Sequence, residues 1–335
     1  MIKVGIIGGG RIGQIHAKAI SKLEGAKVVA IADAFMNDET KMKIANNGNI
    51  KFFKSHEEML EKADLDAVYI CSPTSEHVKH AKDSIKAKKH VFCEKPVSFN
   101  LDEIKAINKL VDESGKVFMV GHNRRFDHNF MALKDAIKSG KVGDVYQLKI
   151  SSRDPGLPPI QYIEKSGGLF MDMMIHDLDM SLNLINKKPI SIYATGAALV
   201  NPEIKKVGDI DTAIVTITFE DNTMAVIDNC RLAKYGYDQR AEVHGSLGSA
   251  QIGNEKPSTL IVSNENGVTS EKPLHFFLER YMKSYENEAV NFIDSINGND
   301  KPKATITDAY NAVLLAKAAA ISLKEKRVVN LSELD

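Results

Sequence analysis

Residues 3–13 read Lys-Val-Gly-Ile-Ile-Gly-Gly-Gly-Arg-Ile-Gly, an apolar run followed by closely spaced glycines. The last six residues fit the pattern G-x-G-x-x-G and are Gly8, Gly9, Gly10, Arg11, Ile12 and Gly13. The apolar run predicts a buried strand and the following residues predict a helix, which is the context that this pattern requires. Small residues let the backbone approach a pyrophosphate, and the helix N-terminus offers N–H donors. The alternative is a glycine-rich turn that binds no ligand.

Asp33 ends the second strand-like run, about twenty residues after the glycines, where a carboxylate can accept hydrogen bonds from an adenosine ribose. The alternative is a solvated acid at a strand end. Together the glycines and Asp33 predict dinucleotide binding. They favour NAD over NADP, because a 2′-phosphate would meet the negative charge of Asp33. The residues that follow, Ala34 to Met36, supply no base to offset it.

Bulk properties exclude several classes of protein. The 335 residues predict two domains, and a composition of 43% hydrophobic and 26% charged residues is ordinary for a globular protein. Lys+Arg and Asp+Glu both number 44, so no basic excess points to nucleic acid or to an anionic membrane. We expect no membrane-spanning segment and no signal peptide. Three scattered cysteines predict reduced thiols and a cytoplasmic protein.

The first third of the chain alternates apolar runs with amphipathic segments, which predicts βαβ units and a doubly wound parallel sheet. The expected strands are 3–7, 28–32, 67–71, 90–93 and 117–120. The expected helices are 12–23, 57–61, 76–87 and 101–113, the last capped by Asn100.

After about residue 122 the pattern changes to period-2 alternation, which predicts a mostly antiparallel sheet. The expected strands are 145–152, 191–198, 212–219, 223–229 and 240–245, and the expected helices are 126–139, 169–185, 276–296 and 307–324. We therefore predict a Rossmann domain over residues 1–122. An α+β domain with a large open sheet, for substrate binding and oligomerisation, would cover residues 123–335.

A resemblance to a known family rests on two further motifs, Cys93-Glu94-Lys95-Pro96 and Cys71-Ser72-Pro73-Thr74-Ser75-Glu76-His77. With the glycine loop, they resemble the Gfo/Idh/MocA oxidoreductases over essentially the whole chain. Three other segments, 152–159, 167–179 and 235–240, resemble the members that oxidise inositols. The resemblance implies the predicted two-domain fold and a homo-oligomer, with a tetramer as the first expectation. It also extends the expected cofactor-binding set, which becomes Gly8, Gly10, Arg11, Ile12, Gly13, Asp33, Ser72, Pro73, Thr74, His77, Glu94, Lys95 and Arg125.

Asp172 and His176 lie one helical turn apart after a glycine pair in the predicted helix 169–185. At 100° per residue, Asp179 joins them on one stripe and Asp177 falls off it. The residues alone also allow the alternative of a helix whose polar stripe faces water. The family resemblance favours a catalytic site.

Oxidising a secondary alcohol requires a group that takes the hydroxyl proton and a group that stabilises the developing alkoxide. His176 is the expected general acid/base, because imidazole titrates near neutral pH. Lys95 is expected to orient and polarise the reacting oxygen, since it follows a parallel strand where ligands bind in such sheets. A surface lysine is the alternative reading. Asp172 would orient both groups, and the hydride would pass to nicotinamide C4.

The expected substrate is a cyclic polyol, oxidised at a ring hydroxyl of myo-inositol to the 2-keto product. Each hydroxyl of such a substrate needs a polar partner. The candidates are Lys95, Asn123, Arg125, Asp154, Asp172, His176, Asp179 and Tyr235. Arg125 could instead lie over the cofactor, Tyr235 could be sheet packing, and His77 could cap a helix or lie on its surface.

Other functions stay open. They are oxidation of scyllo-inositol or of an aldopyranose with NAD or NADP, and a catalytically silent NAD-binding sensor. Retention of Lys95, Asp172 and His176 argues against the sensor. No metal site is expected, because the spacing of His90, Cys93 and His176 matches no zinc pattern.

Overall fold

The computed structural model describes residues 1–45 and 49–334 and divides into two compact units. The first contains Met1–Asp127 and Met282–Asn311, and the second contains His128–Tyr281 and the chain from Ala312 onward.

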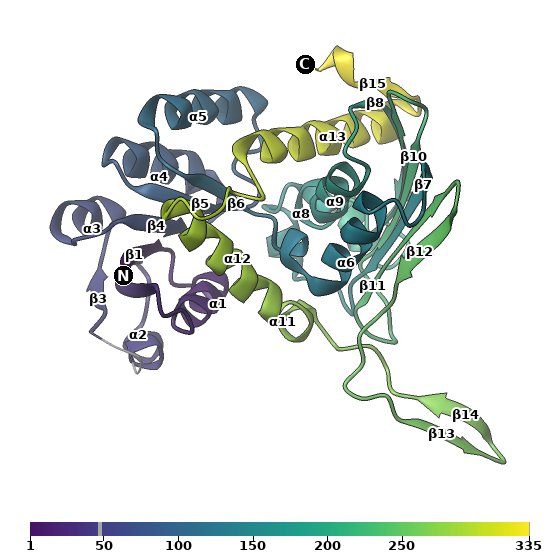
Figure 1. The fold of residues 1–335 in the computed structure, drawn as a ribbon, viewed down its shortest axis with the longest axis horizontal. Coiled ribbons are helices and arrows are strands. Elements are labelled where there is room, and N and C mark those ends of the chain that lie inside the picture. The colour runs from purple at the N-terminus through teal and green to yellow at the C-terminus, as the bar shows by residue number, and fades with distance from the viewer. Residues whose placement is uncertain (46–48, 335) are drawn as a thin grey trace. The chain divides into compact units, whose positions relative to one another are not determined.

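The first unit is built on a six-stranded, all-parallel sheet in the order β3-β2-β1-β4-β5-β6 (Figure 1). Its strands are β1 (Ile2–Ile7), β2 (Ala26–Ala32), β3 (Lys51–Phe53), β4 (Ala67–Ile70), β5 (His90–Glu94) and β6 (Phe118–Gly121). This is the predicted Rossmann sheet, with β3 as an added edge strand. Strand order reverses between β1 and β4, so the crevice at the carboxyl ends of these strands is the expected place for a ligand.

The helices of the first unit follow the predicted amphipathic segments, except that α2 was not predicted. They are α1 (Arg11–Ile20), α2 (Asp38–Ala45), α3 (His56–Lys62), α4 (Thr74–Lys86), α5 (Leu101–Ser114) and α12 (Met282–Ile296), with a 3-10 turn, η1, at Asn123–Phe126. Helices α4 and α5 cover one face of the sheet, and α1 and α12 the other (Figure 1). Asn100 caps α5 as predicted, because its side chain accepts from the Asp102 amide at 2.8 Å.

The compact units differ from the predicted division at residue 122 because α12 belongs with the first unit. Its ring Phe292 packs edge-on against Tyr69 of β4 and Phe92 of β5, with ring centroids 5.3 and 5.8 Å apart. A second ring, Tyr285, packs against His16 of α1. The aromatic core of the nucleotide-binding unit therefore includes a helix that lies far along the chain.

The second unit contains a seven-stranded sheet in the order β12-β11-β7-β10-β9-β8-β15. Its strands are β7 (Val145–Arg153), β8 (Pro189–Ala197), β9 (Thr212–Phe219), β10 (Met224–Cys230), β11 (Asp238–Gly245), β12 (Gly248–Ile252) and β15 (Val329–Asn330). All pairs are antiparallel except β7 with β10. The predicted mostly antiparallel sheet is confirmed, and its alternating burial leaves one face of polar and apolar side chains exposed.

The helices of this unit are mostly short. They are α6 (His128–Lys138), α7 (Ile160–Ile163), α8 (Gly168–Asp172), α9 (Ile175–Ile185), α10 (Pro202–Lys206) and α11 (Phe277–Arg280), and a 3-10 turn, η2, covers Leu331–Glu333. A separate hairpin, β13 (Ile261–Asn264) and β14 (Gly267–Ser270), extends from the sheet with all eight residues exposed (Figure 1).

The prediction of one continuous helix over residues 169–185 is wrong. The chain breaks between α8 and α9, where the Met174 amide donates to the Leu169 carbonyl, five residues back, at 2.9 Å. Met173 and Met174 are 6% and 0% exposed, so burial of both side chains holds the turn. Asp172 thus ends one helix and His176 belongs to the next.

Helix α13 (Ile306–Glu325) begins in the first unit and continues into the second. Contrary to the sequence expectation, it is long and apolar enough, by length and composition alone, to cross a membrane. Core helices share these properties, and more than half of its residues are buried in the protein. Within the second unit its Ser322 hydroxyl receives a hydrogen bond from the Ala194 amide of β8 at 2.9 Å. We therefore interpret α13 as a core helix.

Candidate active site

The glycine loop between β1 and α1 forms a cradle that side chains would fill. Gly8 has a φ of +94°, and a Cβ there would lie 2.7 Å from the Cys71 carbonyl carbon. A Cβ on Gly13 would lie 2.0 Å from the Gly8 carbonyl oxygen. At Gly10, the N-cap of α1, no atom lies within 4 Å of a Cβ position. The loop is therefore tight on its inner side and open where a pyrophosphate would approach the helix N-terminus. Arg11 is exposed and Ile12 half-buried beside it.

The Asp33 carboxylate is fixed at this loop by two backbone donors. Oδ2 accepts from the Gly9 amide at 2.8 Å and Oδ1 accepts from the Phe35 amide at 2.8 Å. The side chain is half-buried at the carboxyl end of β2. A rigid acid beside the glycine cradle is what ribose hydroxyls require, so the residues present fit NAD.

His77 joins the two loops that carry the other cofactor candidates. Its Nε2 lies 2.8 Å from the Ser72 carbonyl oxygen and its Nδ1 lies 2.8 Å from the Pro96 carbonyl oxygen. The residue is 1% exposed, so it does not lie on the helix surface. Burial lowers the pKa of His77, although both carbonyl acceptors oppose this. Pro73 and Thr74 begin α4, and the Ser72 hydroxyl contacts His80 Nδ1 at 2.9 Å.

Glu94 and Lys95 follow each other at the carboxyl end of β5. Glu94 Oε1 lies 2.6 Å from Nε2 of the fully buried His16. The His16 ring packs among Tyr69, Phe92 and Tyr285. Glu94 is thus held inside the unit, while Lys95 is half-buried at the strand end, where the sequence predicts a ligand.

Asn123 and Arg125 lie in the turn η1 after β6. Asn123 is 4% exposed. The Arg125 guanidinium donates to the Lys303 carbonyl at 2.7 Å and pairs with Asp308 at 3.0 Å. Burial would raise the pKa of Asp308, but Arg125 and the hydrogen bonds from Thr305 hold it below its usual range. Arg125 therefore ties η1 to the start of α13.

In the second unit, Asp172 and His176 are both half-buried, one on each side of the break between α8 and α9. The preceding Gly167 and Gly168 adopt φ values of +84° and +83°, and the Asp209 carboxylate accepts from the Leu169 amide at 3.0 Å. These contacts fix the start of α8. His176 Nδ1 is buried.

The other acids of this segment are buried more deeply. Asp177 is fully buried and accepts from Asn229 Nδ2 at 3.0 Å, which fits its predicted position off the working stripe. Asp179 is 1% exposed. Because the helix is broken, the predicted stripe through Asp172, His176 and Asp179 is not one helical face. His176 and Asp179 still share a face of α9.

Asp154 and Tyr235 lie near the carboxyl end of β7 and before β11. Asp154 is half-buried, and its carbonyl accepts from the Ala233 amide. The Tyr235 hydroxyl donates to the buried Asp238 at 2.6 Å and accepts from Arg153 at 3.1 Å. Burial and then Asp238 raise the pKa of Tyr235. Its hydroxyl is therefore already engaged in a network of side chains on the sheet.

Sequence reasoning missed two partners of Asp172. The Tyr162 hydroxyl donates to Oδ1 at 2.8 Å, and Arg231 Nη1 donates to Oδ2 at 3.2 Å. No local motif marks either residue. The one available signal is a lone arginine at the end of an alternating strand, Met224–Cys230.

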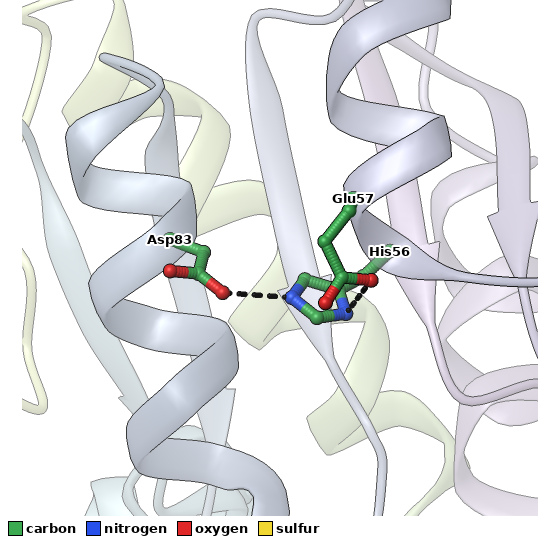
Figure 2. A group of neighbouring side chains, drawn as sticks. All are labelled: His56, Glu57 and Asp83. Atoms are coloured by element: carbon green, nitrogen blue, oxygen red, sulfur yellow. Dashed lines mark hydrogen bonds and ion pairs between the residues drawn. The ribbon is translucent and has the colours of Figure 1, made fainter.

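A cluster of possible metal ligands outside these loops consists of His56, Glu57 and Asp83 (Figure 2). Figure 2 shows the His56 ring between the two carboxylates, with Nδ1 3.0 Å from Glu57 and Nε2 2.9 Å from Asp83. Each ring nitrogen thus has its own acceptor, and the arrangement is explained by a link between α3 and α4. Next to it, burial and then His56 lower the pKa of His80 to about 4, which keeps this partner of Ser72 neutral.

The parallel sheet, the glycine cradle and Asp33 define a dinucleotide-binding protein of the Rossmann class. Comparison with known proteins gives the family. Residues 2–122 match the oxidoreductase family with an NAD-binding Rossmann fold, and residues 130–251 match the GFO/IDH/MocA C-terminal domain.

The chain is 46% identical to an uncharacterized oxidoreductase of Bacillus subtilis, covering 96% of this chain and 94% of the relative. It is 42% identical to a myo-inositol 2-dehydrogenase of Thermotoga maritima, covering 99% of each. A scyllo-inositol dehydrogenase of Lactobacillus casei, solved with NAD(H) and scyllo-inositol, superposes with a TM-score of 0.91 at 30% identity, covering 99% of each chain. The protein belongs to the Gfo/Idh/MocA family of oxidoreductases, and its cofactor is NAD.

Proposed function

We propose that this protein catalyses the NAD-dependent oxidation of a ring hydroxyl of myo-inositol to the 2-keto product. The observation that carries the proposal is the half-buried pair Asp172 and His176, fixed on either side of the α8–α9 break. It occurs in a chain that is 42% identical over its length to a myo-inositol 2-dehydrogenase. An imidazole is suited to proton transfer at neutral pH, and a carboxylate can orient it and balance its charge.

Each catalytic residue has a defined task in this proposal. His176 accepts the hydroxyl proton on its imidazole ring. Lys95 polarises the reacting oxygen and stabilises its developing negative charge. Asp172 orients these groups and balances their charge. NAD, when bound, supplies the hydride acceptor.

The proposed partners of the remaining ring hydroxyls are Asn123, Arg125, Asp154, Asp179 and Tyr235. Asp154 is half-buried, whereas the Arg125 side chain is 6% exposed and Asn123 and Asp179 are 4% and 1% exposed. A polyol offers both donors and acceptors, so a set that mixes carboxylates, an amide and a guanidinium matches its chemistry. Asp154 is the strongest candidate of the set, since it is half-buried and follows a strand that is fixed in the sheet.

Scyllo-inositol is the second candidate substrate. The specific observation in its favour is the solved relative that binds scyllo-inositol and NAD(H) and that covers 99% of this chain. An aldopyranose substrate and a silent sensor have no such support. The three cysteines are free, which agrees with our proposal that the enzyme works in the cytoplasm.

Two substitutions test the proposed roles. Lys95→Ala and His176→Ala should each lower kcat for myo-inositol by at least about a hundredfold, which is far more than either weakens NAD binding. Tyr146→Phe, an exposed position on the sheet, is the control and should keep wild-type kinetics. Near-wild-type turnover in either alanine variant would remove that residue from the mechanism.

A further inference from the structure

The Asp172 carboxylate is gripped on both of its oxygens by side chains from different elements. Tyr162 of α7 donates to Oδ1 at 2.8 Å, and Arg231, which follows β10, donates to Oδ2 at 3.2 Å. Asp172 is the last residue of a five-residue helix, so α8 alone gives its side chain little rigidity. We call Tyr162 and Arg231 together the Asp172 clamp.

Burying the guanidinium of Arg231 costs desolvation free energy. It is 1% exposed, and its Nε and Nη2 have no hydrogen-bond partner among the residues that the structure describes. Its one ion pair within residues 1–45 and 49–334 is with Asp172. A buried cation with a single carboxylate partner is a poor source of stability, because an apolar residue of similar volume would serve as well or better. This points to a purpose other than stability.

The positions of both clamp residues are fixed by their backbones. The Arg231 amide donates to the Asp211 carbonyl at 2.8 Å, and Asp211 is itself fully buried. Tyr162 lies in the short helix α7, whose start is set by Pro159. Burial and then Asp172 raise the pKa of Tyr162, so its hydroxyl remains a donor to the carboxylate. Both hydrogen bonds therefore hold the carboxylate in one orientation relative to the sheet.

We infer that Tyr162 and Arg231 are positioning residues of the dehydrogenase, which act on the reaction only by fixing the Asp172 carboxylate. The inference rests on the proposed function, because it gives the clamp its purpose through the catalytic role of Asp172. Tyr162 and Arg231 thus act on the reaction without touching substrate or cofactor.

A double-mutant cycle on kcat tests the clamp. Tyr162→Phe and Arg231→Gln should lower kcat by about tenfold and about a hundredfold, since each removes a hydrogen bond to a charged group. In an Asp172→Asn background, either substitution should lower kcat by less than about twofold further, because its only route to the reaction is already lost. Single-turnover NADH formation at saturating polyol measures all six proteins, and the Kd for NAD should stay near the wild-type value.

Arg280→Gln is the matched control. Arg280 is also buried, at 6% exposed, and pairs with Glu255 of the same unit at 3.3 Å. If Arg280→Gln lowers kcat through general destabilisation, it should lower kcat by the same factor in the wild-type protein and in Asp172→Asn. The clamp inference is overturned if Tyr162→Phe and Arg231→Gln each lower kcat by the same factor in the wild-type protein and in Asp172→Asn.

Further variants cover the case in which Arg231→Gln does not fold. If Arg231→Gln does not fold, Arg231→Lys takes its place, because it retains the charge, and it should recover part of kcat while still coupling to Asp172→Asn. Tyr162→Phe, which removes one hydroxyl at an exposed residue, carries the same test independently. Absence of turnover in the wild-type protein with any polyol would overturn the proposed function, whereas turnover with multiplicative losses would overturn the clamp alone.

Discussion

Asp33 is the residue on which cofactor choice depends. Its two oxygens are held by the Gly9 and Phe35 amides, so the negative charge cannot swing away from a 2′-phosphate. Replacing the acid and adding a base, as in Asp33→Ser with Ala34→Arg, should lower the ratio of kcat/KM for NAD over NADP by at least about tenfold. Steady-state kinetics with both cofactors measure the ratio. An unchanged ratio would show that Asp33 does not select NAD.

The sequence predicts site residues that lie close together along the chain. Gly8, Gly13 and Asp33 lie within one βαβ unit, and their spacing alone indicates the cradle and its acid. The Asp172 clamp was beyond such reasoning, because Arg231 lies 59 residues from Asp172 and meets it only through the packing of the second unit. His16 is a similar case, since its partner Glu94 is 78 residues away.

Helix α12 carries a buried acid, Glu288, whose protonation should make the stability of the fold depend on pH. Glu288 is fully buried, and neither carboxylate oxygen has a hydrogen-bond partner among the described residues. Burial, and then the negative charge of Glu94, raise the pKa of Glu288 well above 4.5. The folded state therefore holds a proton that the unfolded state releases as the pH rises above about 4.5.

A raised folded-state pKa contributes stability at low pH, and this contribution is lost as the pH rises. Glu288→Gln should therefore gain free energy of unfolding relative to wild type between pH 5 and pH 8, by at most about 1.4 kcal/mol per pH unit.

Urea unfolding at several pH values measures this, with Glu286→Gln on the same helix as the control. Lys22 and Lys283 lower the pKa of Glu286 by pairing with it, so its removal should cost stability as the pH rises through the acid range. If the free energies of unfolding of Glu288→Gln and wild type change in parallel between pH 5 and pH 8, Glu288 is not protonated in the folded state.

Element prediction succeeded where periodicity was long and regular. Strand β9 was predicted with its observed bounds, because Thr212–Phe219 is rich in β-branched residues and places apolar residues at every second position. The helix over residues 169–185 was predicted without its break, because the two methionines at the break are as apolar as a helix interior. The hairpin β13–β14 was missed, since four-residue strands carry too little pattern.

The hairpin also gives a prediction for the whole molecule. Ile261, Val262 and Val268 are 63%, 44% and 73% exposed on it, and an isolated two-stranded hairpin is only marginally stable in water. The exposed face of the main sheet adds Tyr193 and Ile214, at 39% and 50%. These surfaces support the proposal that the protein assembles into a homo-oligomer, with a tetramer as the first expectation.

Light scattering coupled to size exclusion tests the assembly. Wild type should elute as an oligomer, and Ile261→Glu with Val268→Glu should shift it toward smaller species without loss of helical content. Lys205→Glu, an exposed position on α10, is the control. A monomeric wild type would contradict the proposal.

This Gfo/Idh/MocA oxidoreductase should oxidise an inositol with NAD. The most direct measurement is NADH absorbance with myo-, scyllo- and chiro-inositol, glucose and xylose, each with NAD and with NADP. We predict the highest kcat/KM for myo-inositol with NAD, and its near-complete loss in His176→Ala. Absence of NADH with every inositol, or turnover of glucose or xylose alone, would contradict the claim.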